Sequence, residues 1–280
     1  MSISMPTTLA EALDTLSRNP GARLLAGGTD TMVEVNFNRF KPTDVIGLRR
    51  IGELRDYKVD SDRVTIGAGV PWAVIERGDI AAALPALAAA ARTVGSPQIR
   101  AAGTIGGNLG TCSPAGDGLP VLSALEADIH LASSRGERVV RFADFMTGVK
   151  RNCREADEII SAVSITRPKG FQDYAKVGTR NAMVISVAGV CFVHDQLTSS
   201  VRVALGSVGP TIIRATEAET WLASQMNLCE RLVADEDIAS EFARLVGAAA
   251  RPISDHRSTA QYRTHAVQTL ARRLYMRGTR

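Results

Sequence analysis

Alternation of apolar and polar positions divides the chain into strands and helices. Short apolar runs predict strands at 23–26, 44–48 and 63–69. A run rich in alanine and leucine at 71–93 predicts one or two packed helices. Thr8 followed by Glu11 has the spacing of a capping box and predicts a helix over 8–18. The first hundred residues are therefore predicted to be α+β.

Residues 96–120 are rich in Gly, Ser, Thr and Pro, which predicts a long loop. Loops of this length in compact domains are usually functional. After it we expect a helix over 119–127, a hairpin of 128–134 and 138–145 that turns at Arg135-Gly136, and a strand over 157–165.

Arg167-Pro168-Lys169-Gly170 interrupts the pattern and predicts a domain boundary, with one domain at 1–167 and another at 168–280. In the second domain, alternation predicts antiparallel strands at 173–180, 184–193 and 200–209. Helical periodicity predicts helices at 218–223, 230–250 and 259–277. The expected fold is a smaller α+β domain with a three-stranded antiparallel sheet backed by helices.

Composition indicates a globular protein, since 45% of the 280 residues are hydrophobic. No apolar stretch is long enough to predict a membrane span, and the N-terminus lacks a charged region followed by an apolar one, so we expect a cytoplasmic location. The net charge of +4 is spread out, so no nucleic-acid partner is expected. The four cysteines form no C-x-x-C pair and the four histidines show no ligand spacing, so we predict no metal and no catalytic base.

Two glycine-rich segments carry the candidate chemistry. Leu24 to Thr31 reads LLAGGTDT, and Gly103 to Asn108 reads GTIGGN. Consecutive amides without side chains form anion nests that suit a pyrophosphate. Thr29, Thr104 and Asn108 add polar side chains, and Asp117 supplies an acceptor. A dinucleotide fits these parts, although the chain has neither a G-x-G-x-x-G opening a βαβ unit nor a Walker A motif.

The motifs LLAGGTD, IRAAGTIGGNLGTCSPAGDGLP, DEIISAVSI, YAKVGTR and ALGSVGPTIIRATEAE occur in this order. In this order and spacing the chain resembles the FAD-binding medium subunits of molybdenum hydroxylases, the family of xanthine dehydrogenases and aerobic carbon monoxide dehydrogenase. The resemblance covers nearly the whole chain. It implies a two-lobed FAD-binding domain of the PCMH and vanillyl-alcohol-oxidase type, followed by a C-terminal domain of the CO dehydrogenase flavoprotein type.

The resemblance also assigns roles to individual residues. It places the FAD pyrophosphate between the two glycine segments, the adenosine part at Asp117, Ile160 and Tyr174 near the flavin ring, and Lys176 at the polar edge of that ring. The residues predicted to bind the cofactor are Leu24, Leu25, Ala26, Gly27, Gly28, Thr29, Asp30, Thr31, Gly103, Thr104, Ile105, Gly106, Gly107, Asn108, Cys112, Ser113, Asp117, Ile160, Tyr174 and Lys176.

Ordinary structural roles compete with these assignments. Gly27-Gly28 could form only a turn and Gly106-Gly107 only a bulge. Asp117 has the position of a helix N-cap, and Lys176 that of a solvated lysine on a strand. Cys112 could be a small packed residue.

By resemblance, the chain is an electron-transfer subunit and not the site of hydroxylation. A small subunit with 2Fe-2S clusters and a large molybdopterin subunit are the expected partners, in a dimer of heterotrimers. NAD is the first expectation for the electron acceptor, with a xanthine or another N-heterocycle as the hydroxylated substrate. Two alternatives stay open: a stand-alone flavoprotein oxidase, and a non-catalytic nucleotide-binding module.

Overall fold

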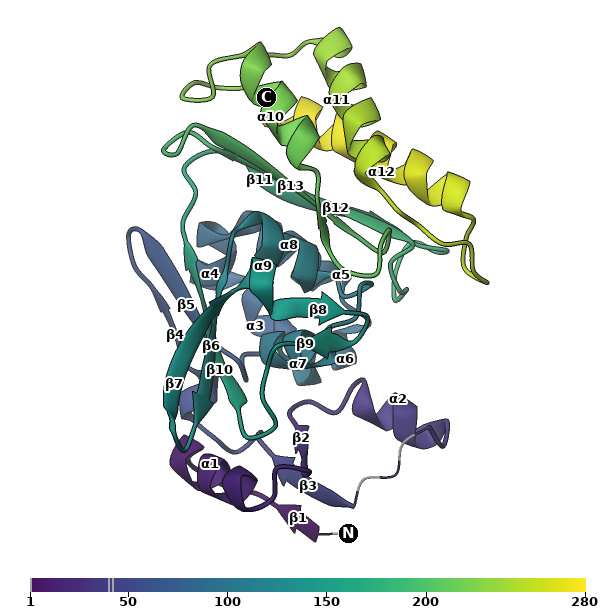
Figure 1. The fold of residues 1–280 in the computed structure, drawn as a ribbon. Helices are drawn as coiled ribbons and strands as arrows, with labels where there is room; N and C mark the ends of the chain where they lie inside the picture. The colour runs from purple at the N-terminus through teal and green to yellow at the C-terminus, as the bar shows by residue number, and fades with distance from the viewer. Residues whose placement is uncertain (1, 40, 42) are drawn as a thin grey trace.

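The computed structural model describes residues 2–39, 41 and 43–280. Figure 1 shows three stacked parts: a small N-terminal sheet, a larger central sheet with helices, and a C-terminal sheet with helices on its outer face. The chain passes through these parts in order. The central sheet takes its strands from two stretches, 57–67 and 128–166.

The N-terminal part is a parallel sheet in the order β1-β3-β2. Its elements are β1 (Ser2–Ser4), α1 (Leu9–Arg18), β2 (Arg23–Leu25), α2 (Thr31–Asn36) and β3 (Asp44–Gly47). The hydroxyl of Thr8 accepts the N–H of Glu11 and begins α1 as predicted. A capping box also implies that the Glu11 carboxylate accepts the N–H of Thr8. That expectation is wrong, because the carboxylate accepts the N–H of Thr7, one residue before the cap.

The central part is an antiparallel sheet in the order β4-β5-β10-β6-β7. Its strands are β4 (Tyr57–Val59), β5 (Arg63–Gly67), β6 (Asp128–Ser133), β7 (Gly136–Arg141) and β10 (Ile159–Thr166). Around it lie η1 (Glu53–Arg55), α3 (Trp72–Ile75), α4 (Gly78–Ala83), α5 (Pro85–Thr93), α6 (Pro97–Ala102), α7 (Ile105–Thr111), α8 (Gly118–Ala124), α9 (Phe142–Phe145), β8 (Met146–Gly148) and β9 (Arg151–Asn152).

The predicted loop at 96–120 is wrong over most of its length, because α6 and α7 lie within it. Ser96 and Thr104 begin these helices by accepting N–H groups three residues later. The glycines of α7 hid that helix, since glycine is a poor helix former, and α6 spans only six residues. In the hairpin that follows, Ser133 pairs with Gly136, so the turn is one residue earlier than predicted.

The C-terminal part is an antiparallel sheet in the order β11-β12-β13-β14. Its elements are β11 (Gln172–Val177), β12 (Ala188–Asp195), β13 (Ser200–Gly206), β14 (Ile213–Arg214), α10 (Thr216–Gln225), α11 (Glu236–Ala249) and α12 (Ala260–Gly278). The prediction of three strands missed the short β14. The helix predicted from Glu230 begins at 236, because the Asp235 carboxylate caps it.

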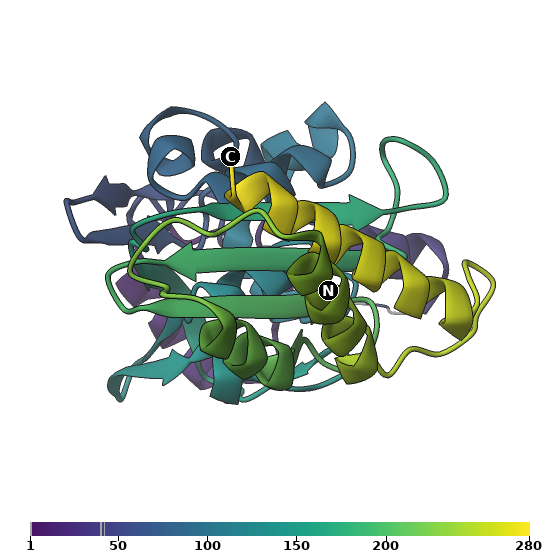
Figure 2. The same ribbon diagram turned by 90° about the horizontal axis from the view of Figure 1, so that it is seen from above.

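Both faces of the C-terminal sheet are buried. Figure 2 shows α10, α11 and α12 lying across its outer face, where Val190 and Phe192 join their core. On the inner face Cys191 and Val193 join the core of the central part. The central and C-terminal parts therefore share an interface without a solvent layer, and the predicted boundary at 167/168 falls in the connection between β10 and β11. None of the helices in the described residues is long and apolar enough to cross a membrane.

Candidate functional site

The first glycine segment forms an open turn at the carboxyl end of β2. Its residues Leu24 to Thr31 are all half-buried, so the segment lies at a surface without being part of the core. Gly28 has φ +73°, a left-handed conformation that glycine adopts without strain. Among the described residues, no acceptor is hydrogen-bonded to the N–H groups of 27–30. These N–H groups are therefore available as donors, which the predicted anion nest requires.

The second segment lies directly against the first. A Cβ at Gly27 would stand 1.8 Å from the carbonyl oxygen of Ala102, and a Cβ at Gly103 would stand 3.3 Å from the Thr29 hydroxyl. Thr111, at the end of α7, donates its hydroxyl to the Asp30 carboxylate at 3.3 Å. The structure thus brings together the two segments that the sequence separates by more than seventy residues. Gly27 is required for this packing rather than for the approach of a ligand.

The second segment does not form a nest of free amides, and that part of the prediction is wrong. The N–H of Ile105 donates to Val70, that of Gly106 to Ala68, and those of Gly107 and Asn108 to the hydroxyl and carbonyl of Thr104. A Cβ at Gly106 would stand 2.5 Å from Ala68, so this glycine serves close packing. Any role in binding falls to the side chains.

Asn108 offers such a side chain. Its Oδ1 atom is buried and has no hydrogen-bond partner among the described residues. A Cβ at Gly116 would stand 2.6 Å from Nδ2 of Asn108, and a Cβ at Gly118 would stand 2.9 Å from its Oδ1. This amide is therefore packed against the start of α8 and the segment before it. Buried polar atoms without partners are rare in folded proteins and indicate a missing ligand or water.

Three other predicted residues lie deeper. Cys112 ends α7 in the left-handed conformation and is fully buried, and burial raises the pKa of its thiol to about 12. Ile105 and Ile160 are in the same core. The side chain of Cys112 therefore packs and cannot reach a cofactor. Ser113 remains half-buried, and its hydroxyl accepts the N–H of Ala115.

Asp117, Tyr174 and Lys176 form one buried polar cluster at the interface of the central and C-terminal parts. The Lys176 ammonium donates to Asp117 Oδ2 at 2.6 Å and to the carbonyls of Thr93 and Val184 at 3.0 Å. The Tyr174 hydroxyl donates to Asp117 Oδ1 at 3.1 Å. Burial raises the pKa of Asp117, and attraction to Lys176 opposes that rise.

This cluster bears on four of the predictions. The ammonium has three N–H groups and all three are used, so Lys176 has no donor for a flavin edge. Asp117 and Lys176 touch, so they cannot serve opposite ends of an extended FAD. Asp117 precedes α8, but its side chain makes no capping hydrogen bond. Tyr174 is 5% exposed and does not offer a ring face to a ligand.

Sequence reasoning missed the charged residues beside the first segment. Lys150, in the turn between β8 and β9, donates to Glu34 at 2.9 Å and lies 3.8 Å from Asp30. Arg23 lies 3.3 Å from the same Glu34, and the hydrogen bond from Lys150 lowers the pKa of that carboxyl. No local signal links Lys150 to Glu34, which is 116 residues away in the chain. Within the described part of the chain, no group of three His, Cys, Asp or Glu side chains could hold a metal ion.

Comparison with known proteins gives two domain matches. Residues 1–168 match the family described as the FAD binding domain in molybdopterin dehydrogenase. Residues 173–277 match the CO dehydrogenase flavoprotein C-terminal domain.

Relatives extend over the same range. The chain is 41% identical over 192 residues to the nicotinate dehydrogenase FAD-subunit of Eubacterium barkeri, covering 66% of this chain and 65% of that protein. It is 32% identical over 277 residues to the xanthine dehydrogenase FAD-binding subunit of Escherichia coli O157:H7, covering 95% and 92%. A solved carbon monoxide dehydrogenase from Hydrogenophaga pseudoflava superposes with a TM-score of 0.86 at 27% identity, covering 98% and 95%.

The two domain matches together span most of the chain, and they agree with the order of the parts seen in the fold. The full-length relative shares more than 30% of its residues over nearly the whole of both chains. The chain therefore belongs to the FAD-binding medium subunits of the molybdenum hydroxylases, a family of oxidoreductases.

Proposed function

We propose that this chain binds FAD with the pyrophosphate at the open turn of 26–30. The observation that carries the proposal is the set of free N–H groups at 27–30, next to the left-handed Gly28. Such donors bind phosphate oxygens at close range. The adjoining second segment supplies the Thr104 hydroxyl and the orphaned Asn108 Oδ1, which suits a hydroxyl or amino group of the cofactor.

The function we infer is electron transfer within a multi-subunit hydroxylase. FAD, when bound, accepts electrons one at a time and delivers two, which suits transfer from an iron-sulfur partner to a two-electron acceptor. The chain's own contribution is to hold the cofactor and exclude water from it. The 2Fe-2S clusters and the molybdopterin belong to a small and a large partner subunit, which is supported by the family to which the chain belongs.

The finer assignments are also proposals. NAD is the proposed acceptor, a xanthine or another N-heterocycle the proposed substrate, and a dimer of heterotrimers the proposed assembly. The names of two relatives, a xanthine dehydrogenase and a nicotinate dehydrogenase subunit, support a heterocyclic substrate. The proposed domain boundary remains at 167/168.

The test is an absorption spectrum and cofactor extraction on the complex co-expressed with its two partners. Wild type should carry one FAD per chain, and Gly28→Trp should lose it, because an indole at this backbone position fills the space in front of the amides. Gly110→Ala is the matched control, since a Cβ there meets nothing within 4 Å. Bleaching by a purine followed by NADH formation supports the finer assignments.

Other results would contradict the proposal. A folded complex without flavin would favour the nucleotide-binding module, and alcohol oxidation by the isolated chain would favour the stand-alone oxidase. Retention of FAD by Gly28→Trp would place the pyrophosphate elsewhere.

A further inference from the structure

A second candidate binding site lies on the N-terminal part of the molecule. A surface pocket of about 690 Å³ is lined by Met5, Thr7, Arg49, Arg50, Gly52 and Arg55. This volume is in the range of pockets that take nucleotide-sized ligands. Half of these lining residues are arginines, and none of the described residues that line the pocket is acidic. Its ligand is therefore expected to be an anion.

The three arginines are not neutralised within the chain. Among the described residues, no carboxylate or carbonyl accepts a hydrogen bond from the guanidinium groups of Arg49, Arg50 or Arg55, and all three residues are exposed. Two nearby carboxylates bind backbone N–H groups rather than these arginines: Glu11 accepts the N–H of Thr7, which lines the pocket, at 2.8 Å, and Glu53 accepts that of Leu9 at 3.2 Å. The pocket thus keeps three guanidinium groups available.

The position of the pocket in the sheet supports a ligand site. β1 and β2 both run parallel to β3, so their carboxyl ends share one edge. Met5 follows β1, and its sulfur lies 2.4 Å from where a Cβ at Gly47 would stand. Arg49 and Arg50 follow β3, and the proposed pyrophosphate turn follows β2. In parallel sheets this edge is where ligands bind.

This end of the sheet therefore offers two separate sets of hydrogen-bond donors. The turn after β2 offers backbone N–H groups, and the pocket beside β1 offers guanidinium groups. Leu48 separates them along the edge, since it follows β3 and its N–H donates to the carbonyl of Leu25. A single pyrophosphate at the turn leaves the arginines unpaired.

We propose that the pocket of Arg49, Arg50 and Arg55 binds a second phosphorylated ligand of nucleotide size. Guanidinium groups match phosphate oxygens with paired hydrogen bonds. The Met5 side chain and the aliphatic stems of the arginines supply an apolar wall for a base or another flat group. The site does not depend on the proposed electron transfer, since it uses none of the residues of the open turn.

The experiment is a calorimetric titration of the FAD-loaded complex with ADP, so that the first site is already filled. We expect one ADP per chain, competition by inorganic pyrophosphate, and at least tenfold weaker binding in Arg49→Ser/Arg50→Ser. Arg273→Ser is the matched control, because Arg273 is an exposed arginine of α12 with no partner among the described residues. Arg49→Lys/Arg50→Lys should recover part of the affinity, since it restores the charge without the guanidinium fork.

Several results would overturn the proposal. Absence of ADP binding to the FAD-loaded complex, or equal weakening by Arg273→Ser, would show that the arginines form no site. Loss of FAD from Arg49→Ser/Arg50→Ser would assign them to the first site. Binding of an acidic peptide without binding of ADP would assign the surface to a protein partner. Each of these differs from failure of the proposed function, in which wild type carries no FAD.

Discussion

The Lys176 ammonium lies 2.6 Å from the Asp117 carboxylate, and both side chains are only 8% exposed. Lys176 is on β11 and Asp117 precedes α8, so the ion pair joins the C-terminal sheet to the central part. Gln172 and Tyr174, at alternate positions of the same strand, also donate toward the central part. The side chains on one face of β11 therefore make polar contacts with the central part across the interface.

Replacement of Lys176 by methionine should destabilise the protein strongly. Removing one partner of a buried ion pair costs about 3–5 kcal/mol, because the other charge stays buried. The double variant Lys176→Met/Asp117→Asn should be less destabilised than Lys176→Met, since its asparagine carries no charge. Urea unfolding at pH 7 measures both, with the exposed Lys169→Met as control.

The pH dependence of Lys176→Met gives a second readout. Burial raises the pKa of Asp117, so the folded state keeps a proton at a higher pH than the unfolded state does. The folded variant therefore gains relative stability as pH falls and loses it as pH rises. If Lys176→Met instead leaves stability unchanged and alters the flavin spectrum, the lysine serves the cofactor and the structural assignment is wrong.

Alanine at Gly27 and at Gly28 should differ in effect. At Gly27 the new Cβ meets the Ala102 carbonyl, so the two glycine segments must separate. The free energy of unfolding should fall by more than about 2 kcal/mol. At Gly28 the new Cβ makes only ordinary contacts with the side chains of Leu25 and Met32, at 3.6 Å and 3.7 Å, and the left-handed φ costs about 1–2 kcal/mol. Denaturation midpoints of the two variants and of Gly110→Ala test this order. Equal losses at the two positions would contradict it.

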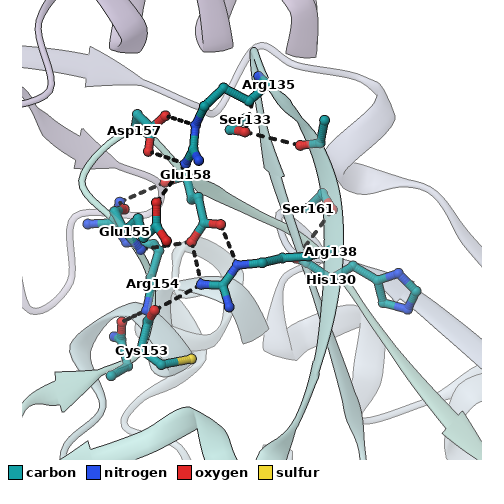
Figure 3. Close-up of polar contacts among 12 residues, drawn as sticks. His130, Ser133, Arg135, Arg138, Cys153, Arg154, Glu155, Asp157, Glu158 and Ser161 are labelled. Atoms are coloured by element: carbon teal, nitrogen blue, oxygen red, sulfur yellow. Dashed lines mark hydrogen bonds and ion pairs between the residues drawn. The ribbon is translucent and has the colours of Figure 1, made fainter.

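Arg138 should matter more than Arg135, although Arg135 makes more ion pairs. Figure 3 shows Arg135 with Glu155 and Asp157, and Arg138 with Glu158. Glu158 is only 4% exposed and takes two hydrogen bonds from Arg138, at 2.6 Å and 2.8 Å. Arg138→Ala leaves this buried carboxylate without its ion pair, which costs about 1–3 kcal/mol, nearer the lower end because Arg138 is half-exposed.

Arg135→Ala removes contacts at a solvent-exposed site, where water and salt replace them. We expect no measurable change in the denaturation midpoint for this variant. A larger loss for Arg135→Ala than for Arg138→Ala would show that burial of Glu158 does not decide the energetics of this network.

Local signals in the sequence predicted most elements but not the contacts between them. The cap at Thr8, the helix predicted over 259–277 and the apolar run of β12 depend on neighbouring residues, and the structure confirms them. The Asp117–Lys176 pair joins residues 59 positions apart, and no periodicity encodes it. In the candidate site, the glycine spacing predicted the free amides at Gly27 to Asp30. The glycine spacing could not show that acceptors on Thr104 and Ala68 already bind the N–H groups of the second segment.

The ionised carboxylate of Asp255 should stabilise the folded protein, and this stabilisation should be lost at acidic pH. Burial alone would raise its pKa, but the N–H groups of Arg257 and Ser258 and the Arg263 guanidinium, 2.7 Å away, lower the pKa to about 2. Arg263 also donates to the carbonyls of Val187 and Ser207, so this contact holds the segment before α12 against the C-terminal sheet.

The direction follows from the two pKa values. The folded carboxyl ionises at about pH 2, below the ordinary value of 3.8 that applies to the unfolded chain. The stabilisation is therefore complete above about pH 4 and declines as the pH falls toward 2. Wild type should exceed Asp255→Asn in stability at pH 6, and the difference should shrink at pH 2.5. The exposed Asp14→Asn is the control, and a difference that stays constant over this range would exclude Asp255 as the group that titrates.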